Sequence, residues 1–402
     1  MDFRINRIGL LGLSLLALVV GMVTGLGAVA FRALIAFIHN AFFLGSVSIV
    51  YDANQFTAPG PWGPFVILVP VIGGLIVTFL VTNYAPEARG HGVPEVLDAI
   101  YYKEGKIRPV VAAIKSLASA FSIGTGAAVG REGPIIQIGA TLGSSFGQLI
   151  HMAPWQRITL VAAGAGAGIA ATFNTPIGGV MFAIELMLPE LSARTFLPVA
   201  LSTGAATFVG RVFLGLQPAF VVPSAFYLHT EQPPFVALLA FALLGALIGL
   251  AATAFIRTLV FAEDTFPKIK NPYLRHSAGM LMIGALIYAL LRYQGHYFVE
   301  GVGYATIQAI LQDNLVGFAL LLSLFAAKLF ATSVSLGSGA SGGIFSPSLF
   351  MGATLGAAFG GLCNTIGPIH GVDPVTCAII GMAAMVGGGT GAAMTAVTMI
   401  FE

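Results

Sequence analysis

Long apolar runs separated by short polar stretches dominate the pattern of this chain. Arg4 and Arg7 precede an apolar run over 8–37, and a second run follows over 65–81, beyond a loop rich in proline and glycine. A helix that spans the hydrocarbon core needs about 17 to 25 apolar residues, so both runs are long enough to cross a membrane. The basic residues before the first run predict a cytoplasmic N-terminus.

The same pattern predicts further helices in both halves of the chain. In the first half they cover 90–102, 110–121, 134–151, 158–172, 177–187 and 196–213. In the second half they cover 235–261, 279–291, 303–311 and 316–332, followed by helices that continue to residue 402. Two basic loops separate some of these helices, with Lys103, Lys106 and Arg108 in one and Lys268, Lys270 and Arg275 in the other. The first of these loops is expected on the cytoplasmic side.

Composition places this chain in a lipid bilayer. Of its residues 57% are hydrophobic and 8% are charged, against about 25% charged in soluble domains. The mean hydropathy is +0.92, and the 51 glycines suit closely packed transmembrane helices. We expect a multi-pass protein of the cell membrane, inner or plasma. The net charge of +2 comes without a basic patch, so no nucleic-acid partner is expected.

Candidate catalytic or metal-binding clusters are absent from the sequence pattern. Cys363 and Cys377 both fall in apolar stretches, which argues against a disulfide framework or a metal site. No group of His, Asp or Glu residues has the spacing of metal ligands or of a nucleophile and its base. We therefore expect neither an enzyme nor a bound cofactor.

One unit occurs twice in this chain. The stretches 124–147 and 337–360 align without a gap, and both contain a Gly-rich turn, a proline and the block GATLG. Pro134 aligns with Pro347, and each proline stands near the start of an apolar helical run. Proline suits the first helical turn, because its missing N–H would be unpaired there anyway. The pattern therefore predicts two helix starts at matching places.

Such helix starts form an anion site without any cationic side chain. Glycines before the proline let the backbone approach a ligand closely. The unpaired N–H groups at that end of a helix carry roughly half a positive charge. Two such starts in matching repeats inside a membrane would aim both positive ends at one point. The sequence therefore predicts an anion site between the two Gly-rich turns.

The internal match extends beyond these two stretches. Further matched pairs are Gly90/Gly301, Gly92/Gly303, Lys115/Lys328, Gly164/Gly381 and Glu185/Glu402. We expect a first membrane repeat over 1–215, an extracellular linker over 216–234 and a second membrane repeat over 235–402. The second copy stops where the first continues, so we expect it to lack its last helices. Inverted and parallel repeats would align equally well, which leaves their relative orientation open.

Three motifs resemble those of the CLC family of chloride channels and chloride/proton antiporters. They are GHGVPE at 90–95, GREGP at 130–134 and GGIFSP at 342–347, and they occur in the family's order. The resemblance covers nearly the whole chain. It implies an all-α polytopic membrane protein with the CLC-type inverted double repeat and broken, re-entrant helices. It also implies a homodimer with one anion pathway in each subunit.

The resemblance implies roles for individual residues. Glu132 corresponds to the gating glutamate, whose carboxylate can occupy the place of the anion and leave it when protonated. Such a role suits a buried carboxylate, because its protonation depends strongly on its surroundings. The matching position of the second repeat is Phe345, so only one copy carries the gate. The residues expected to hold the anion, mainly through backbone amides, are His91, Gly92, Gly130, Arg131, Gly343, Ile344 and Phe345.

Two positions depart from the family's pattern. His91 stands where the family usually has a serine whose hydroxyl holds the anion; its imidazole either donates to the anion or turns away and leaves that work to the backbone. Leu186 stands where the antiporters carry an internal proton glutamate, directly after Glu185, and leucine cannot carry a proton. Either water or another acid such as Glu190 replaces that glutamate, or proton coupling is weak or absent. We expect Glu185 itself to be structural.

These observations lead to a functional expectation with alternatives. The first hypothesis is CLC-type transport of chloride in exchange for protons, gated by Glu132. The alternative is a passive anion channel without proton coupling, because of Leu186. A different secondary transporter would need charged side chains around a large intramembrane cavity, and this chain offers few. Lys115 and Lys328 lie in apolar runs, where they either tune the field near the pathway or are structural.

Overall fold

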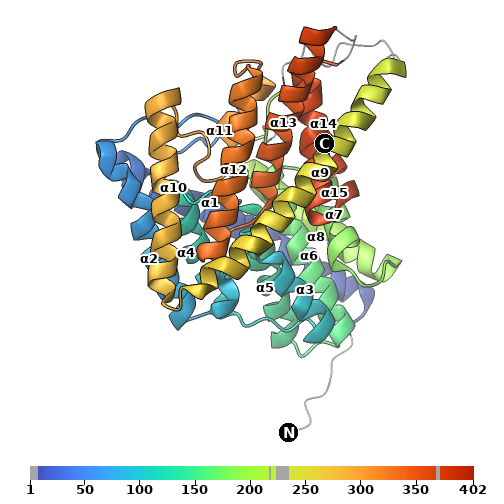
Figure 1. Ribbon diagram of the computed structural model, residues 1–402. Coiled ribbons are helices and arrows are strands. Elements are labelled where there is room, and N and C mark those ends of the chain that lie inside the picture. The colour runs from blue at the N-terminus through green and yellow to red at the C-terminus, as the bar shows by residue number, and fades with distance from the viewer. Residues whose placement is uncertain (1–7, 217–218, 223–234, 368–371) are drawn as a thin grey trace.

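The computed structural model describes residues 8–216, 219–222, 235–367 and 372–402, and these are almost entirely helical (Figure 1). The α-helices of the first half are α1 Leu10–His39, α2 Val69–Asn83, α3 Val93–Tyr102, α4 Val110–Gly124, α5 Glu132–Leu149, α6 Pro154–Phe173, α7 Pro176–Phe182 and α8 Ala193–Leu214. Those of the second half are α9 Phe235–Thr265, α10 Pro272–Gln294, α11 Tyr304–Leu311, α12 Phe318–Ser338, α13 Phe345–Ile366, α14 Pro374–Thr390 and α15 Ala393–Phe401.

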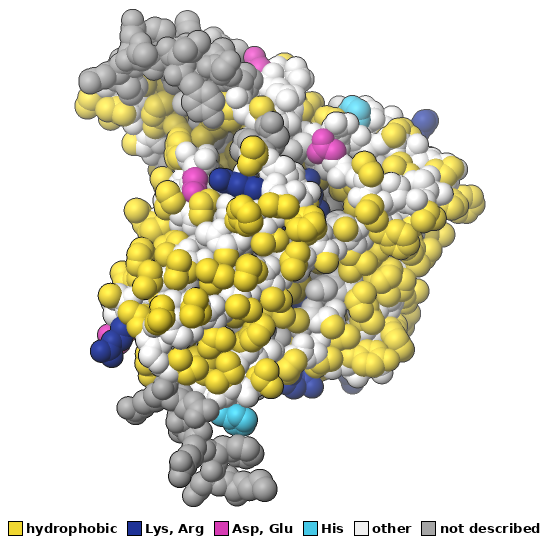
Figure 2. Space-filling view, turned by 180° about the vertical axis from the view of Figure 1, so that it is seen from behind, with side chains coloured by type: hydrophobic (Ala, Val, Ile, Leu, Met, Phe, Trp, Pro, Cys, Tyr) yellow, Lys and Arg dark blue, Asp and Glu magenta, His cyan; other side chains and the backbone are white. Residues whose placement is uncertain are grey.

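Apolar side chains cover the outside of this helical assembly. Within the described residues, 7 helices are long and apolar enough to cross a membrane. On α9, Leu238, Leu243 and Leu250 are each more than half exposed, which suits contact with lipid. Figure 2 shows a broad apolar surface on one face, with most of the charged side chains near its upper and lower margins. The chain is therefore a multi-pass membrane protein.

Helix α10 begins earlier than the hydrophobic pattern predicted. It starts at Pro272 rather than 279, so Arg275 lies in its first turn and not in a basic loop. The side chain of Asn271 accepts hydrogen bonds from the amides of Tyr273 and Leu274 at 2.9 and 3.3 Å. An Asn cap followed by proline at the first position stabilises a helix start. The helix therefore begins at this cap, although the residues of its first turn are polar.

Helix α12 ends later than predicted, at Ser338 rather than 332. The end of this helix carries buried hydroxyl groups that form hydrogen bonds with the first repeat. Thr332 Oγ1 donates to the carbonyl of Ala128 at 2.8 Å, and Ser335 Oγ accepts from the amide of the same residue at 3.2 Å. Buried polar groups need such partners, so contacts between the repeats extend this helix.

Paired helices in each repeat approach one another through glycines. A Cβ atom added to Gly139 on α5 would overlap the carbonyl oxygen of Gly164 on α6. The same relation joins Gly352 on α13 to Gly381 on α14. Small residues let membrane helices pack backbone against backbone, and these four glycines are two of the pairs related by the internal match. The repeat in the sequence is therefore also a repeat in helix packing.

Two helix breaks occupy matching places and meet in space. Helix α6 is followed by Asn174, which adopts a left-handed conformation before α7 begins at Pro176. Helix α14 ends in the same way at Gly391, just before α15. The short helices α7 and α15 lie side by side, as Figure 1 shows. The break at Asn174-Thr175-Pro176 and its counterpart thus bring the ends of the two repeats together.

The cations of the basic loop between α3 and α4 are paired with acidic side chains of the loop, of α3 and of the segment before α3. Its ion pairs are Lys103 with Asp98 at 2.5 Å, Lys106 with Glu104 at 2.9 Å, and Arg108 with Glu87 at 2.6 Å. The two hydrogen bonds from Arg108 lower the pKa of Glu87, and the hydrogen bond from Lys106 lowers the pKa of Glu104. The loop is therefore an exposed, internally paired surface.

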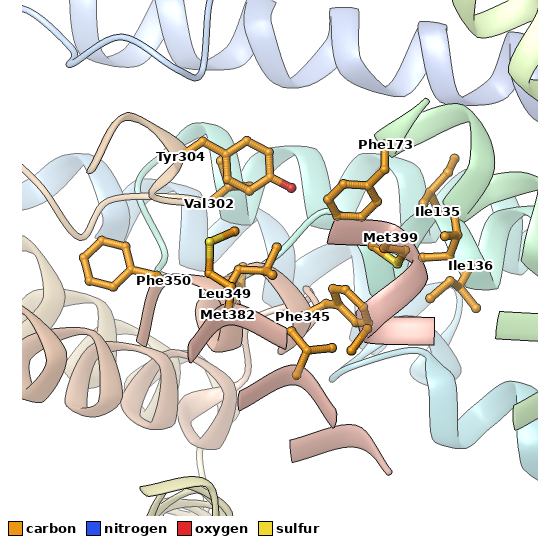
Figure 3. Packing of buried hydrophobic residues seen from close by; sticks show 14 of the residues in the cluster. Ile135, Ile136, Phe173, Val302, Tyr304, Phe345, Leu349, Phe350, Met382 and Met399 are labelled. Atoms are coloured by element: carbon orange, nitrogen blue, oxygen red, sulfur yellow. The ribbon is translucent and has the colours of Figure 1, made fainter. Parts of the chain in front are cut away.

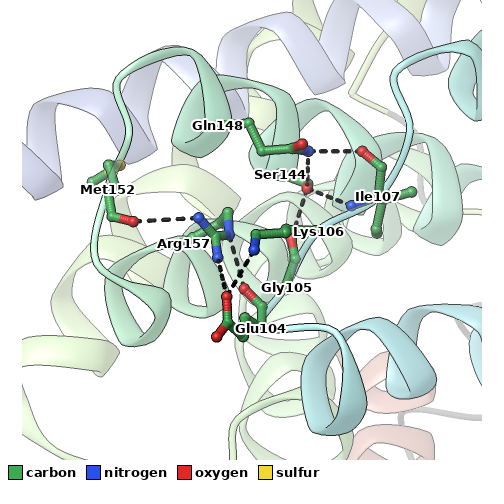
Figure 4. Close-up of polar contacts among 8 residues, drawn as sticks. All are labelled: Glu104, Gly105, Lys106, Ile107, Ser144, Gln148, Met152 and Arg157. Atoms are coloured by element: carbon green, nitrogen blue, oxygen red, sulfur yellow. Dashed lines mark hydrogen bonds and ion pairs between the residues drawn. The ribbon is translucent and has the colours of Figure 1, made fainter. Parts of the chain in front are cut away.

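The same loop is anchored to α5 and α6 (Figure 4). Arg157 Nε donates to the carbonyl of Glu104 at 2.8 Å, and Ser144 Oγ donates to the carbonyl of Gly105 at 2.7 Å. The hydroxyl of Ser144 also accepts from the amide of Ile107 at 2.9 Å. These bonds fix the end of α3 against α5, the helix that begins at Glu132.

Some predicted features lie outside the described residues. Arg4 and Arg7, which carry the prediction of a cytoplasmic N-terminus, belong to residues 1–7. Most of the predicted linker 216–234 also lies outside, since only 216 and 219–222 are described there.

Candidate functional site

The three Gly-rich motifs converge at the centre of the molecule. Gly130 and Gly343 exchange two backbone hydrogen bonds, each 2.7 Å long. The segment at Gly90 runs parallel to Ser341, and the carbonyl of Gly90 accepts from the amide of Gly342 at 3.2 Å. The two matched Gly-rich turns are therefore in direct backbone contact, and the 90–95 motif lies against them.

This close approach requires glycine. A Cβ atom added to Gly133 would overlap the carbonyl oxygen of His91 and would lie 2.9 Å from the Cα of Gly343. A Cβ atom added to Gly130 would lie 2.6 Å from Glu132 Oε2. Real Cβ atoms do not tolerate such distances, so any larger residue at these positions would separate the motifs or displace the glutamate.

The backbone pairing changes which amides an anion could use. We expected Gly130 and Gly343 to offer their N–H groups, but each donates to the carbonyl of the other in this structure. Arg131 and Ile344 are the residues just before α5 and α13, and Phe345 is the first residue of α13. The amides of these three residues donate to no other described residue. They remain the backbone donors that an anion could reach.

The carboxylate of Glu132 occupies the start of α13. This side chain is fully buried, and its Oε2 accepts from the hydroxyl of Ser346 at 2.5 Å and from the amide of Ser346 at 3.3 Å. Its Oε1 accepts from the hydroxyl of Tyr304. The unpaired amides at a helix start favour negative charge. The carboxylate therefore takes the position in which a small anion would be stabilised.

Two of the donors to Glu132 were not predicted from the sequence. Ser346 lies inside the GGIFSP motif, but only the residues before it were assigned to the site. Tyr304 follows Gly303, which the internal match pairs with Gly92, so its place at the start of a short helix had a local signal. No local sequence pattern predicts that its hydroxyl contacts a residue of the other repeat. Figure 3 shows the hydroxyl of Tyr304 pointing between the helices toward Phe173.

Arg131 lies over the ring of Tyr304 and close to Glu132. The centre of its guanidinium is 4.9 Å from the ring centroid, and its Nε is 4.0 Å from Glu132 Oε1. The ring also meets Phe220 edge to face, with the ring centroids 4.8 Å apart. Arg131 thus contacts both members of the Glu132–Tyr304 pair through its side chain.

The imidazole of His91 faces a different helix. Its Nε2 is 3.3 Å from Glu263 Oε1 on α9, and the two side chains are 20% and 41% exposed. The backbone of His91 stays at the convergence of the motifs, where its carbonyl lies against Gly133. The structure therefore brings the backbone of His91 to the site and directs its side chain to Glu263.

The two intramembrane lysines hold matching loops. Lys115 Nζ donates to the carbonyls of Ala88 and Gly90 at 3.1 and 2.8 Å. Lys328 Nζ makes the corresponding bonds to Val299 and Gly301 at 2.9 and 2.8 Å. Both lysines are fully buried.

These bonds fix the turns that precede the short helices α3 and α11. Gly92 and Gly303, the residues immediately before those helices, have φ angles of +90° and +78°. Left-handed backbone of this kind favours glycine, which accounts for the matched glycines of the sequence. The paired lysines thus have a clear structural role, because each donates to two carbonyls of the turn that precedes its short helix.

Glu185 and Glu402 cap each other's neighbouring helices. Glu185 accepts from the amides of Met394 and Thr395 at 3.0 and 2.8 Å, at the start of α15. Glu402 accepts from the amides of Ile177 and Gly178 at 3.0 and 2.9 Å, at the start of α7. A carboxylate at a helix start is favourable, so this reciprocal arrangement ties the two repeats together. Leu186 is partly buried, and Glu190 is exposed.

A cavity of about 350 Å³ adjoins the Glu132–Tyr304 pair; we call it the gate cavity. Its described lining includes Arg32, Asp52, Asn54, Arg131, Thr172 and Tyr304. Within the described part of the chain, no group of three or more His, Cys, Asp or Glu side chains is placed to hold a metal ion.

Comparisons with a family model, with related sequences and with solved structures all point to the same group of proteins. A family model described as voltage gated chloride channel matches residues 73–402. The H(+)/Cl(-) exchange transporter ClcA of Vibrio cholerae serotype O1 is 34% identical over 346 residues, which cover 83% of this chain and 71% of the relative. The protein of the same name from Salmonella paratyphi B is 31% identical over 401 residues, which cover 98% of this chain and 81% of the relative.

Solved structures share the fold. A slow cyanobacterial Cl-/H+ antiporter matches with a TM-score of 0.81 at 24% identity, over 98% of this chain and 89% of its own. A CLC-type fluoride/proton antiporter matches with a TM-score of 0.78 at 23% identity, over 98% and 90%. The expected fold class, an all-α membrane protein with the CLC-type double repeat and broken helices, is confirmed. The chain belongs to the voltage-gated chloride channel family, the CLC family.

Proposed function

We propose that this protein carries chloride across the membrane in exchange for protons, with Glu132 as gate and proton acceptor. One observation supports the proposal above all others: the buried carboxylate of Glu132 occupies the start of α13, held by the hydroxyl and amide of Ser346. A chloride ion would be stabilised at that point by the unpaired amides of the same helix start. Relatives of this chain are named as H(+)/Cl(-) exchange transporters, which favours exchange over passive flow.

The gate would work by competition between two anions for one place. The charged carboxylate excludes chloride from the start of α13, because both are negative and need the same donors. Protonation removes the charge, weakens the hold of these donors and frees the position. When the carboxylate of Glu132 leaves with a proton, chloride takes its place, and when it returns without the proton, chloride is displaced. Proton and anion are thus exchanged at one side chain. The amides of Arg131, Ile344 and Phe345 would receive the ion.

A passive anion channel is the second candidate, because Leu186 stands where a proton-carrying glutamate is expected. Flux measurements on the purified full chain in liposomes separate the two candidates. Proton movement in fixed ratio to chloride and against a chloride gradient supports exchange. Chloride flux without proton movement rejects exchange in favour of the channel, and absence of any halide flux rejects both.

The variant Glu132→Ala tests the gate. It should keep anion flux while losing its pH dependence and all proton coupling, because the competing carboxylate is gone. Proton coupling that survives in this variant would remove Glu132 from the mechanism. The variant Glu190→Ala tests the other acid that could carry protons, since Glu190 is exposed and contacts none of the donors to Glu132. Loss of proton coupling in this variant would identify Glu190 as the inner proton carrier.

Assembly and orientation belong to the same proposal. We place the protein as a homodimer in the cell membrane with its N-terminus in the cytoplasm, since the loop with Lys103, Lys106 and Arg108 is basic and such loops face the cytoplasm. Protease accessibility of an N-terminal tag in intact cells tests the orientation. The mass of the purified particle, corrected for detergent, tests the dimer.

A further inference from the structure

Two arginines from separate helices line the gate cavity. Arg32 comes from α1, and Arg131 immediately precedes α5. Tyr304, whose hydroxyl holds the gate carboxylate, also lines this cavity. Both guanidinium groups therefore border a space that lies next to the gate.

Neither guanidinium is fully used by the protein. Arg32 is partly buried and forms no hydrogen bond or ion pair with another described residue. Arg131 is 9% exposed, and its buried Nε has no hydrogen-bond partner among the described residues. Arg131 has Glu132 as its acidic neighbour, with Nε 4.0 Å from Oε1, and this distance leaves the donors of Nε free for a further acceptor. Donors left without a hydrogen bond beside a cavity are costly, so the two guanidinium groups together favour an anion there.

Asp52 and Glu300, two further carboxylates near the arginines, do not supply this anion. Asp52 is the only acid among the described residues that line the gate cavity, and its oxygens accept from the amide of Asn54 at 3.0 Å and from Gln55 Nε2 at 3.1 Å. Glu300 lines a second, water-sized cavity of about 20 Å³ together with the two arginines, and it does not line the gate cavity. Its Oε1 accepts from the hydroxyl of Thr57 and lies 3.7 Å from His39 Nε2.

We propose that Arg32 and Arg131 form a second anion-binding site in the gate cavity, separate from the site at the helix starts. Its ligand is a small inorganic monoanion such as chloride. A volume of about 350 Å³ leaves room for the ion and several of its waters, so the ion is held by charge before it is fully dehydrated. Guanidinium groups suit this task because they are weakly hydrated and always charged.

The site would load the gate. An anion held between the arginines stands next to the Glu132–Tyr304 pair and can move to the start of α13 as soon as the carboxylate leaves. Fixed charges in a cleft raise the local concentration and the arrival rate of the opposite charge. This loading role rests on the proposed function, whereas binding of the ion does not.

Bromide in crystals of the full chain tests the binding directly, because its anomalous scattering locates each ion separately. The unmodified protein should show bromide beside Arg32 and Arg131. In Arg32→Gln the bromide concentration that half-fills this site should rise about tenfold or more, since one charge-assisted bond is lost. In Asp52→Asn it should fall, because the one acidic group of the lining is removed. Bromide only at the start of α13, or equal filling of the cavity in all three proteins, overturns the proposal.

Chloride flux from liposomes tests the loading role. Arg32→Gln should raise the half-saturating chloride concentration several-fold, and added gluconate should shrink this difference because salt screens exposed charges. Arg32→Lys keeps the charge, so its half-saturating chloride concentration should lie close to that of the unmodified protein. This variant also shows that the position tolerates a substitution. Arg292→Gln is the matched control. Arg292 is exposed at the end of α10, so this substitution removes the same charge outside the cavity.

Equal half-saturation in Arg32→Gln and Arg292→Gln overturns the loading role. Absence of halide flux from the unmodified protein would instead reject the proposed function, and the bromide measurement would then decide the binding site alone.

Discussion

The hydroxyl of Ser346 donates to Glu132 Oε2 at 2.5 Å, which joins the first turn of α13 to the first residue of α5. The other oxygen of the carboxylate accepts from Tyr304, at the start of a third helix. Both oxygens are therefore satisfied by hydroxyl donors of the second repeat. A proton that releases the carboxylate has to compete with these donors, so the two hydroxyls should set how readily the gate opens.

Replacing Tyr304 by phenylalanine should open the gate more often. The variant removes the donor to Oε1 and keeps the ring under Arg131. A hydrogen bond to a charged group contributes about 1.5–3 kcal/mol, so the closed state should lose about that much. We expect chloride flux near neutral pH to rise about tenfold or more where gate opening limits the rate. At acidic pH the difference should shrink, because protonation then opens the gate in both proteins.

The control for this variant is Tyr297→Phe. Tyr297 is also buried but packs edge to face on Phe43 and does not contact Glu132. Liposome flux measured across a pH series compares the two. Equal flux in Tyr304→Phe and the unmodified protein at every pH would show that the phenol does not restrain the gate.

Replacing Lys328 by methionine should destabilise the fold. The ammonium group satisfies the carbonyls of Val299 and Gly301, and methionine fills similar space without a donor. Two buried acceptors lose their partner, and relief from burying a charge offsets part of that cost, so we expect a net loss of about 1–3 kcal/mol. Thermal unfolding in detergent measures it, with exposed Lys270→Met as control. An unchanged melting temperature with weaker chloride affinity would instead assign Lys328 to the field of the pathway.

Replacing Glu185 by glutamine should weaken the contact between the repeats but not the coupling of protons. The carboxylate accepts from two amides and one hydroxyl at the start of α15, and glutamine keeps only one acceptor oxygen. A charged group at such a position is worth about 1–2 kcal/mol. Glu402→Gln, at the matching position, should cost a similar amount. A lost proton-to-chloride ratio at unchanged thermal stability would make Glu185 a proton carrier.

Replacing His91 by alanine should leave anion preference unchanged. Its imidazole lies beside Glu263, and a partly exposed contact of this kind contributes about 0–1 kcal/mol. The backbone of His91 keeps its place against Gly133 in the variant. The ratio of chloride to nitrate flux is the measurement. A clear change in that ratio would show that the imidazole turns from Glu263 to the anion during transport.

Much of the fold is readable along the chain because its causes are local. Runs of apolar residues, prolines at helix starts and glycines at turns act within a few neighbouring positions, and they mark most of the helices to within a few residues. The matched glycines of the two repeats are of the same kind. Gly92 and Gly303 adopt left-handed backbone, and Gly139 and Gly352 allow helices to touch, so the residue type itself reports the geometry.

The partners of the polar groups depend on the folded protein. Tyr304 and Ser346 contact Glu132 although more than 170 residues separate them in the sequence, and no neighbouring residue predicts the contact. The same holds for the amides of Gly130 and Gly343, which satisfy each other, and for Arg32 and Arg131, which meet at one cavity. Hydropathy and helix propensity decide where a helix forms, whereas side-chain pairing at short range depends on how the helices pack, and only the packed structure decides that.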